Sequence, residues 1–244
     1  MDNIRGLLFC GDIHGELNYL VNVILKARNK ISESDIIICG DFGVGFGGPN
    51  SLDVLYDKIK KTLEENNLNI YAIRGNHDDP AYFDGTHTYD RLKLLKDHEV
   101  VEICGKKIYP IGGGVSVDID FPDAIKGRSR REYNNYLISL GSSKRIWWPD
   151  EEILKKTSDL PIKVDIIISH EAPLSFDPPL IRGSQVQYET YKKILDDRNY
   201  LDFVLREVRS SWWFYGHYHH SYCGHSGETN YRCLGINELF QLSN

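Results

Sequence analysis

The amino-acid sequence predicts an α/β fold built around a parallel β-sheet. Short apolar runs typical of buried strands occupy residues 6–10, 35–39, 69–73, 165–168 and 212–215. Between the first three runs, apolar residues recur at helical spacing, and this order of strands and helices is typical of parallel sheets. Polar motifs rich in glycine, aspartate and histidine follow the runs. We therefore expect the loops at the carboxyl ends of these strands to carry the functional residues.

The first half of the chain alternates strands and helices. A helix is predicted after the first strand, because one helical face carries Leu17, Leu20, Val21, Ile24 and Leu25. A second helix, ending near residues 66–67, is predicted from Leu52, Leu55, Ile59 and Leu63. Residues 100–103 and 107–111 flank Cys104-Gly105-Lys106 and predict a β-hairpin.

The second half of the chain has a different pattern. Residues 112–150 carry few apolar periods and many Gly, Pro, Arg and Tyr residues, which indicates an excursion over the active site rather than a second domain. The remaining predicted elements are a strand at 164–169, helices at 186–197 and 200–209, a strand at 211–215 and a final strand near 231–236. We therefore expect residues 1–244 to form a single domain.

The composition restricts the partners and the compartment. The chain has 29 basic and 35 acidic residues, and this net charge of −6 argues against a general nucleic-acid surface or an anionic membrane as partner. No apolar run approaches the roughly 18 residues that span a bilayer, and no signal peptide is recognisable before the first strand. The five cysteines form no CxxC pair and are best explained as apolar core residues. We therefore expect a cytoplasmic protein.

The polar motifs at the strand ends predict a metal site. They are Gly11-Asp12-Ile13-His14-Gly15, Gly40-Asp41, Gly75-Asn76-His77-Asp78, Ser169-His170 and Gly216-His217-Tyr218-His219. Asp12 and His14 are two residues apart, as are His217 and His219, and in extended backbone such pairs point to the same side. Carboxylate, amide and imidazole donors without a thiolate suit Mn, Fe, Zn or Co. Two aspartates and four histidines exceed the needs of one tetrahedral ion but suffice for two ions.

These five motifs, in this order, resemble those of the calcineurin-like metallophosphoesterase superfamily, from about residue 8 to residue 220. The resemblance implies a four-layer α/β/β/α sandwich with two packed mixed β-sheets. It also implies two divalent metal ions (Mn, Fe or Zn), both held by Asp41. The implied ligands are Asp12, His14, Asp41 and His219 for the first ion and Asp41, Asn76, His170 and His217 for the second.

Two further residues gain a role from the resemblance. His77 is implied as the catalytic residue that donates a proton to the leaving oxygen or stabilises its charge; the alternative is a histidine that orients a neighbour. Arg74 resembles a phosphate-contacting arginine and is predicted to bind substrate, with a solvated strand-end arginine as the alternative. Because Asn76 is neutral, the two ions and their ligands would together keep a net positive charge, which attracts a phosphate ester.

The sequence also departs from some relatives. Protein Ser/Thr phosphatases and symmetrical dinucleoside tetraphosphate hydrolases carry a Gly-Asp-x-Val-Asp-Arg-Gly motif, whereas residues 40–45 lack its second Asp and its Arg. This disfavours both substrate classes. The Gly-rich segment 112–118, followed by Arg128, Arg130 and Arg131, is the best candidate for a specificity element, although a solvated charge run is an alternative.

We therefore interpret the chain as an enzyme that hydrolyses a small phosphate ester by a metal-bridging hydroxide. The ester is a monoester or a diester, possibly a nucleotide. One alternative is a nuclease acting on single-stranded nucleic acid. Another is a non-catalytic interaction module on the same fold, but such modules typically lose ligand residues, whereas all seven ligand positions and His77 are present here.

Overall fold

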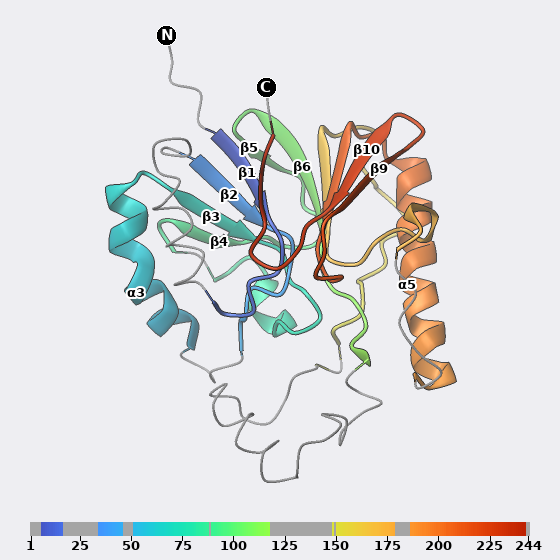
Figure 1. The fold of residues 1–244 in the computed structure, drawn as a ribbon, viewed down its shortest axis with the longest axis horizontal. Coiled ribbons are helices and arrows are strands. Elements are labelled where there is room, and N and C mark those ends of the chain that lie inside the picture. The colour runs from blue at the N-terminus through green and yellow to red at the C-terminus, as the bar shows by residue number, and fades with distance from the viewer. Residues whose placement is uncertain are drawn as a thin grey trace.

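A computed structural model describes residues 6–16, 34–45, 51–87, 89–117, 148, 150–178 and 186–242. Two β-sheets pack face to face, with helix α3 (Ser51–Glu65) on the outer side of one sheet and helix α5 (Tyr188–Glu207) on the outer side of the other (Figure 1). This arrangement confirms the α/β/β/α sandwich that the resemblance implied.

The first sheet contains the first three predicted strands. Its strand order is β11-β1-β2-β3-β4, and β1 to β4 run parallel. The strands are β1 (Gly6–Cys10), β2 (Ser34–Ile38), β3 (Asn69–Ala72), β4 (Leu92–Leu94) and β11 (Leu239–Gln241). Strand β11 runs antiparallel to β1, so that the end of the chain closes the edge beside the first strand.

The second sheet is also mixed. Its strand order is β5-β6-β7-β8-β10-β9, with a parallel centre and antiparallel edges. The strands are β5 (Val101–Ile103), β6 (Lys106–Ile111), β7 (Ile166–Ser169), β8 (Trp212–Tyr215), β9 (Tyr222–Ser226) and β10 (Thr229–Cys233). Strands β5 and β6 form the predicted hairpin.

Three apolar layers hold the sandwich together. Between the sheets, the rings of Phe9 and Phe214 stack with their centroids 3.8 Å apart, and Ile37 and Ile166 belong to the same buried cluster. Neighbours of Phe9 in β1, such as Leu8, point to the opposite side and pack in the cluster that contains α3 residues. Strands covered on both faces are apolar at successive positions, which explains the continuous apolar runs in the sequence.

Several predicted boundaries differ from the structure. The two helices predicted at 186–197 and 200–209 are one helix, α5, because Ile194, Leu201 and Val204 continue one buried face. The last predicted strand lies at Thr229–Cys233 rather than near 231–236. Strands β4, β9 and β11 were not predicted, being short or, in β9, largely exposed. The helix predicted around 17–25 lies outside the described residues.

Two short 3₁₀ helices lie close to the polar motifs in sequence. They are η1 (Pro80–Phe83) and η3 (Leu174–Phe176). In the part of the chain that the structure describes, no helix is long and apolar enough to cross a membrane.

Candidate metal centre

The predicted ligands come from both sheets. Asp12 and His14 follow β1, Asp41 follows β2, and Asn76 follows β3 in the first sheet. His170 follows β7, and His217 and His219 follow β8 in the second sheet. The carboxyl ends of parallel strands share one edge of a sheet, and the two such edges lie together at the lower middle of Figure 1.

The four predicted ligands of the first ion lie close together. One donor atom from each of Asp12, His14, Asp41 and His219 lies within 4.8 Å of all the others. His219 Nε2 is 3.1 Å from Asp12 Oδ2 and 3.1 Å from His14 Nε2. His14 Nδ1 is 3.8 Å from Asp41 Oδ2. The donor atoms therefore converge on one point, as the ligands of a small cation do.

The four predicted ligands of the second ion form a tighter group. Asn76 Oδ1 is 2.8 Å from His170 Nε2 and 3.0 Å from His217 Nδ1, and these two imidazole nitrogens are 3.2 Å apart. Asp41 Oδ1 is 3.5 Å from His170 Nε2. Three of the four side chains are almost fully buried, and His217 is partly exposed.

Asp41 lies between the two groups. Its Oδ2 faces His14 in the first group, and its Oδ1 faces His170 in the second. The backbone N–H of His77 donates to Oδ1 over 3.0 Å, which fixes the carboxylate. Asp41 therefore turns one carboxylate oxygen toward each donor group.

The site is built on left-handed backbone rather than on the extended backbone that we assumed from the sequence. The φ angles of His14, Asp41, His217 and His219 are 43°, 48°, 70° and 57°. Non-glycine residues rarely adopt such angles, and the cost is of order 1–3 kcal/mol each. As a result, His217 and His219 do not point to the same side but belong to different donor groups.

Two glycines make room for the carboxylates. A Cβ atom on Gly75 would lie 2.0 Å from Asp41 Oδ1, and one on Gly216 would lie 2.2 Å from Asp12 Oδ1. Any other residue at either position would push a buried carboxylate out of place. The glycines of the motifs therefore allow close packing of the ligands.

The charges at the centre favour a cation. Burial opposes protonation of His170, but Asp41 and Asp12 outweigh it and raise the pKa of His170 to about 10. Burial lowers the pKa of His217 to about 4, so its imidazole is neutral and offers a lone pair. Two buried carboxylates that attract positive charge, with imidazole and amide donors around them, fit divalent metal ions.

The comparison with known families agrees with this geometry. The sequence profile of the calcineurin-like phosphoesterases matches residues 6–221. The chain belongs to the calcineurin-like phosphoesterase family. It is accordingly a metal-dependent phosphoesterase. No curated protein sequence matches the chain significantly.

Solved structures with a similar backbone are distant in sequence. A phosphopantetheinyl hydrolase from Mycobacterium tuberculosis is 12% identical with a TM-score of 0.44, covering 98% of this chain and 96% of its own. A putative 5'-nucleotidase from Staphylococcus aureus is 14% identical with a TM-score of 0.41, covering 97% of this chain and 50% of its own. A hypothetical protein from Thermus thermophilus is 12% identical with a TM-score of 0.41, covering 95% and 77%. At these values the likenesses carry no conclusion about substrate.

His77 of this phosphoesterase lies beside the first donor group. Its ring centroid is 5.8 Å from that of His14, and the residue is half-buried. Its carbonyl accepts a hydrogen bond from Trp148 Nε1 over 3.2 Å, and its N–H is held by Asp41. The backbone of the predicted catalytic residue is thus anchored on both sides.

The guanidinium group of Arg74, the predicted substrate contact, is held by neighbouring residues of the fold. Its Nε donates to Asp97 over 2.7 Å, and its Nη1 and Nη2 donate to the carbonyls of Glu151 and Glu152 over 2.9 Å each. The side chain is 5% exposed. Its three guanidinium nitrogens are therefore engaged in the fold, which favours a structural role over the predicted contact with substrate.

Asp78, the last residue of the Asn-His-Asp motif, supports the loop that carries Asp41. Its carboxylate accepts four backbone N–H groups, from Phe42, Gly43, Val44 and Gly75. Burial and the nearby Asp41 raise the pKa of Asp78 to about 6. Asp78 therefore ties the loop after β2 to the loop after β3, and this fixes two ligands relative to each other.

Three polar residues lie behind the predicted ligands, and none was predicted to support them, although Ser116 belongs to the predicted specificity segment 112–118. Glu171 is buried beside His170, and its Oε2 is 3.7 Å from His217 Nε2, the ring nitrogen that faces away from the second donor group. Ser116 and Glu151 lie behind Asn76. Glu171 could have been noticed because it follows His170, a predicted ligand, directly in the sequence. The contact between Ser116 and Glu151 could not have been predicted, because the two residues are far apart in the sequence.

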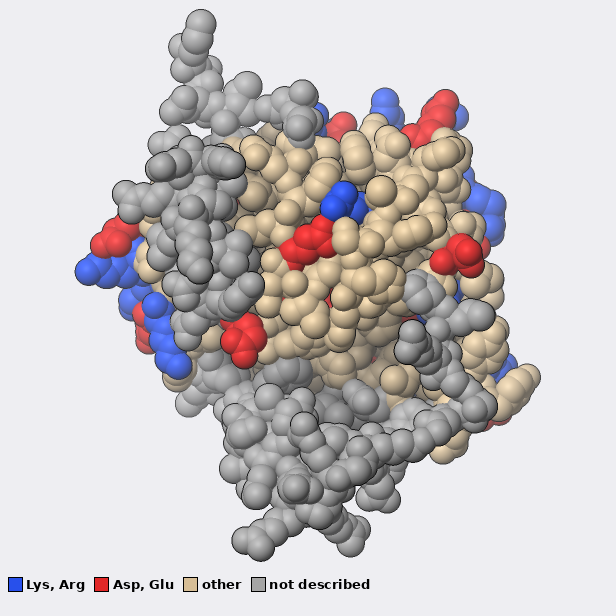
Figure 2. Space-filling model, viewed as in Figure 1, with Lys and Arg blue, Asp and Glu red and all other residues tan. Residues whose placement is uncertain are grey.

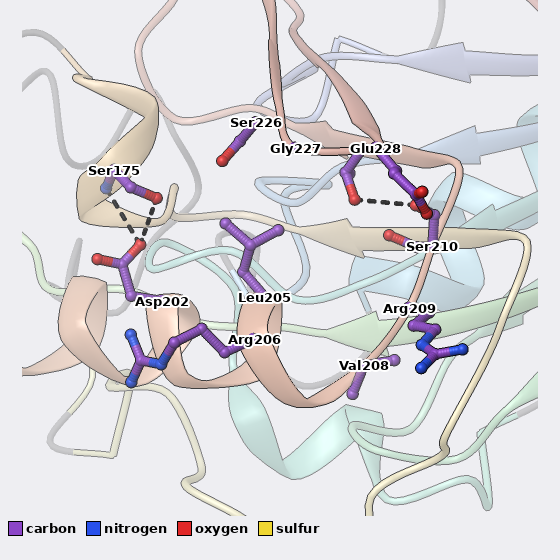
Figure 3. Close-up of a pocket in the computed structure, with 11 residues that line it drawn as sticks. Ser175, Asp202, Leu205, Arg206, Val208, Arg209, Ser210, Ser226, Gly227 and Glu228 are labelled. Carbon is purple, nitrogen blue, oxygen red and sulfur yellow. Dashed lines mark hydrogen bonds between the residues drawn. The ribbon is translucent and has the colours of Figure 1, made fainter.

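A pocket among the described residues lies away from the metal centre. It has a volume of about 470 Å³ and lies where β8 and β10 begin, at the opposite strand ends from the ligands (Figure 3). Ser175 binds Asp202 there through its N–H and its hydroxyl, and Thr229 donates to the carbonyl of Ser210. None of the predicted ligands lines this pocket.

Proposed function

We propose that this phosphoesterase hydrolyses a small phosphate ester at a centre that holds two divalent ions, Mn, Fe or Zn. The observation that supports two ions is the position of Asp41, whose oxygens face different donor groups. If Asp41 is shared, each ion has three further donors of its own, and all seven predicted ligands are accounted for.

The two donor groups support one set of ligands for each proposed ion. The proposed ligands of the first ion are Asp12, His14, Asp41 and His219, and those of the second are Asp41, Asn76, His170 and His217. When bound, two divalent ions supply an acidified water as nucleophile, with its pKa lowered to about 7, and counter the charge of the phosphoryl oxygens. Because Asn76 adds no charge, the pocket keeps a positive surplus that attracts phosphate.

His77 has the role of proton donor in this proposal. The backbone of His77 is hydrogen-bonded to Asp41 and Trp148, so the imidazole side chain extends from a fixed backbone position beside the proposed ligands. A histidine held in this way can give a proton to the leaving oxygen as the ester bond breaks. For Arg74, the contacts of its guanidinium support a structural role rather than the predicted contact with substrate.

The proposed substrate is a small soluble phosphate ester, and whether it is a monoester or a diester is left to the test. On the face shown in Figure 2, the Lys and Arg side chains of the described residues are scattered rather than gathered in a band. A track for long nucleic acid requires such a band, because phosphate contacts dominate its affinity. This observation and the net charge of −6 favour a small substrate over a nuclease substrate.

A single substrate screen tests the proposal. The metal-free chain is loaded with Mn²⁺, Fe²⁺ or Zn²⁺ and assayed on phosphomonoesters, phosphodiesters and single-stranded DNA, with Asp41→Asn as the inactive control. We expect two ions per chain and turnover of one class of small ester. Cleavage of single-stranded DNA without hydrolysis of small esters would support the nuclease alternative, and the absence of all hydrolysis in the two-ion protein would support the non-catalytic one.

A further inference from the structure

Ser116 and Glu151 form a hydrogen-bonded chain behind Asn76. Asn76 Nδ2 donates to Ser116 Oγ over 2.8 Å, and Ser116 Oγ donates to Glu151 Oε2 over 3.0 Å. All three side chains are buried. These hydrogen bonds connect Asn76, the one proposed ligand that is an amide, to Glu151, which is far from Asn76 in the sequence.

The direction of these hydrogen bonds follows from what each group can do. Glu151 Oε1 accepts from the N–H of Ser116, and Oε2 accepts from the N–H of Trp148 over 2.9 Å as well as from Ser116 Oγ. Burial raises the pKa of Glu151 to about 7. Above that pH the carboxylate, which already accepts one backbone N–H on each oxygen, acts as acceptor only. The single hydroxyl proton of Ser116 is therefore committed to Glu151, and the oxygen of that hydroxyl is left to accept from an N–H group.

The consequence for Asn76 is a fixed amide orientation. Because Ser116 Oγ can only accept from Asn76, the NH₂ end of the amide must face Ser116 and the oxygen must face His170 and His217. Oxygen and nitrogen of an amide have nearly the same shape, so packing alone does not choose between the two orientations. A turned amide would present a donor, which cannot bind a cation.

We propose that Ser116 and Glu151 are positioning residues that hold the oxygen of Asn76 toward the second ion. This inference rests on the proposed two-ion centre. Partners behind a ligand typically change metal affinity by about 10- to 100-fold when removed. The same network includes Arg74, which donates to the carbonyl of Glu151 and so helps to hold that residue in place.

The first test is metal binding by Ser116→Ala. Mn²⁺ is titrated into the metal-free full-length protein by calorimetry, and electron paramagnetic resonance separates isolated from spin-coupled Mn²⁺. We expect the second ion to bind about 10- to 100-fold more weakly and the first ion to bind as in the wild type. Ser210→Ala is the matched control, because Ser210 is buried at the opposite strand ends and should leave both ions unaffected.

The second test separates orientation from general support of the fold. In an Asn76→Asp background both side-chain oxygens are equivalent, so no amide orientation remains to be set. If Ser116 acts through orientation, Ser116→Ala costs little further affinity in this background. If Ser116 only supports the local fold, the loss has the same size in both backgrounds, and the inference is overturned.

A second variant covers the case in which Ser116→Ala does not fold. Glu151→Gln keeps the shape but replaces one acceptor oxygen with an NH₂ donor, so at least one of the three groups that donate to Glu151 loses its acceptor and the direction of the Ser116 hydroxyl is no longer fixed. We expect the same selective loss of the second ion. Wild-type affinity for both ions in Glu151→Gln or Ser116→Ala refutes the inference. A wild-type protein that binds fewer than two ions or hydrolyses no ester refutes the proposed function instead.

Discussion

Replacing Arg74 distinguishes a residue that holds the fold together from one that binds phosphate. Arg74→Ala removes one buried ion pair and two hydrogen bonds to carbonyls, all of them short. The paired side chains of Arg74 and Asp97 are 5% and 9% exposed, so solvent screens their interaction little. We therefore expect a large loss of stability and no specific loss of substrate affinity.

The size of the stability loss in Arg74→Ala depends on which partners of Arg74 are left without a hydrogen bond. Removing one partner of a buried ion pair typically costs about 3–5 kcal/mol. Asp97 keeps one donor, the N–H of Gly112 at 2.7 Å, and the carbonyl of Glu151 keeps the N–H of Gly114 at 3.0 Å. The remaining donors lower the penalty, so we expect about 3 kcal/mol, near the lower end of that range.

Urea unfolding of the metal-free protein measures this cost, with Arg209→Ala as the control. Arg209 is exposed, and a surface substitution of this kind changes the unfolding free energy by no more than about 0.5 kcal/mol. Steady-state hydrolysis of an aryl phosphate is measured in parallel at a temperature where both variants are folded. Unfolding within about 1 kcal/mol of the wild type, together with a raised KM, would show that Arg74 binds phosphate and that its contacts in the structure matter little.

Three further predictions follow from the site and its surroundings. Asp41→Asn should lose bound metal and hydrolysis together, as measured by elemental analysis after metal loading; two retained ions with near-normal turnover would contradict the shared carboxylate. His77→Asn should slow an alkyl phosphate by about 10²–10⁴ and a nitrophenyl phosphate far less, with both ions kept; equal slowing would indicate charge stabilisation instead of proton donation. Burial raises the pKa of Asp197 to about 6 although Lys155 lies 3.1 Å away. Folded protein therefore binds this proton more tightly than unfolded protein, and the resulting stability is present below about pH 4 and lost as the pH rises through about 6, by on the order of 3 kcal/mol. Asp197→Asn should lack this loss in urea unfolding at several pH values, and a parallel pH dependence in both proteins would refute it.

The parts of the fold that the sequence predicted are those with strong local patterns. Strands β1, β2, β7 and β8 are buried at nearly every residue, so each appears as a continuous apolar run of the right length. In β3, buried residues alternate with partly exposed ones. Strands β4 and β11 have only three residues each, too few to show a period. Their pairing depends on neighbours far away in the chain, which a local pattern does not record.

Helix α5 is a case in which a local pattern was misleading. Two helical stretches were predicted, at 186–197 and 200–209, but the buried face continues without a break through Tyr200 and Leu201. Packing against the second sheet outweighs the weak helix propensity of single residues. Local propensity was therefore a poor guide where tertiary contacts decide.

The positions of the ligands were predictable, but the supporting contacts were not. The family resemblance placed Asp12 and His219 in one group, and the structure brings them to 3.1 Å although they are separated by most of the chain. Ser116 and Glu151, in contrast, carry no motif that marks them as a pair. Their significance comes from a hydrogen-bond direction, which exists only once the chain has folded.

The backbone strain and the buried charge of the site have a common explanation. His14, Asp41, His217 and His219 occupy left-handed conformations, and Asp12 and Asp41 are buried carboxylates within the same edge of the sandwich. Both features cost free energy in the folded protein. A sequence selected for stability alone would remove them, whereas a bound cation recovers part of the cost because it binds the folded state and not the unfolded one. In the proposed centre, the same residues that make the apoprotein less favourable therefore make metal binding and folding mutually dependent, and the contacts of Asp78, Ser116 and Glu151 hold the proposed ligands in place for that binding.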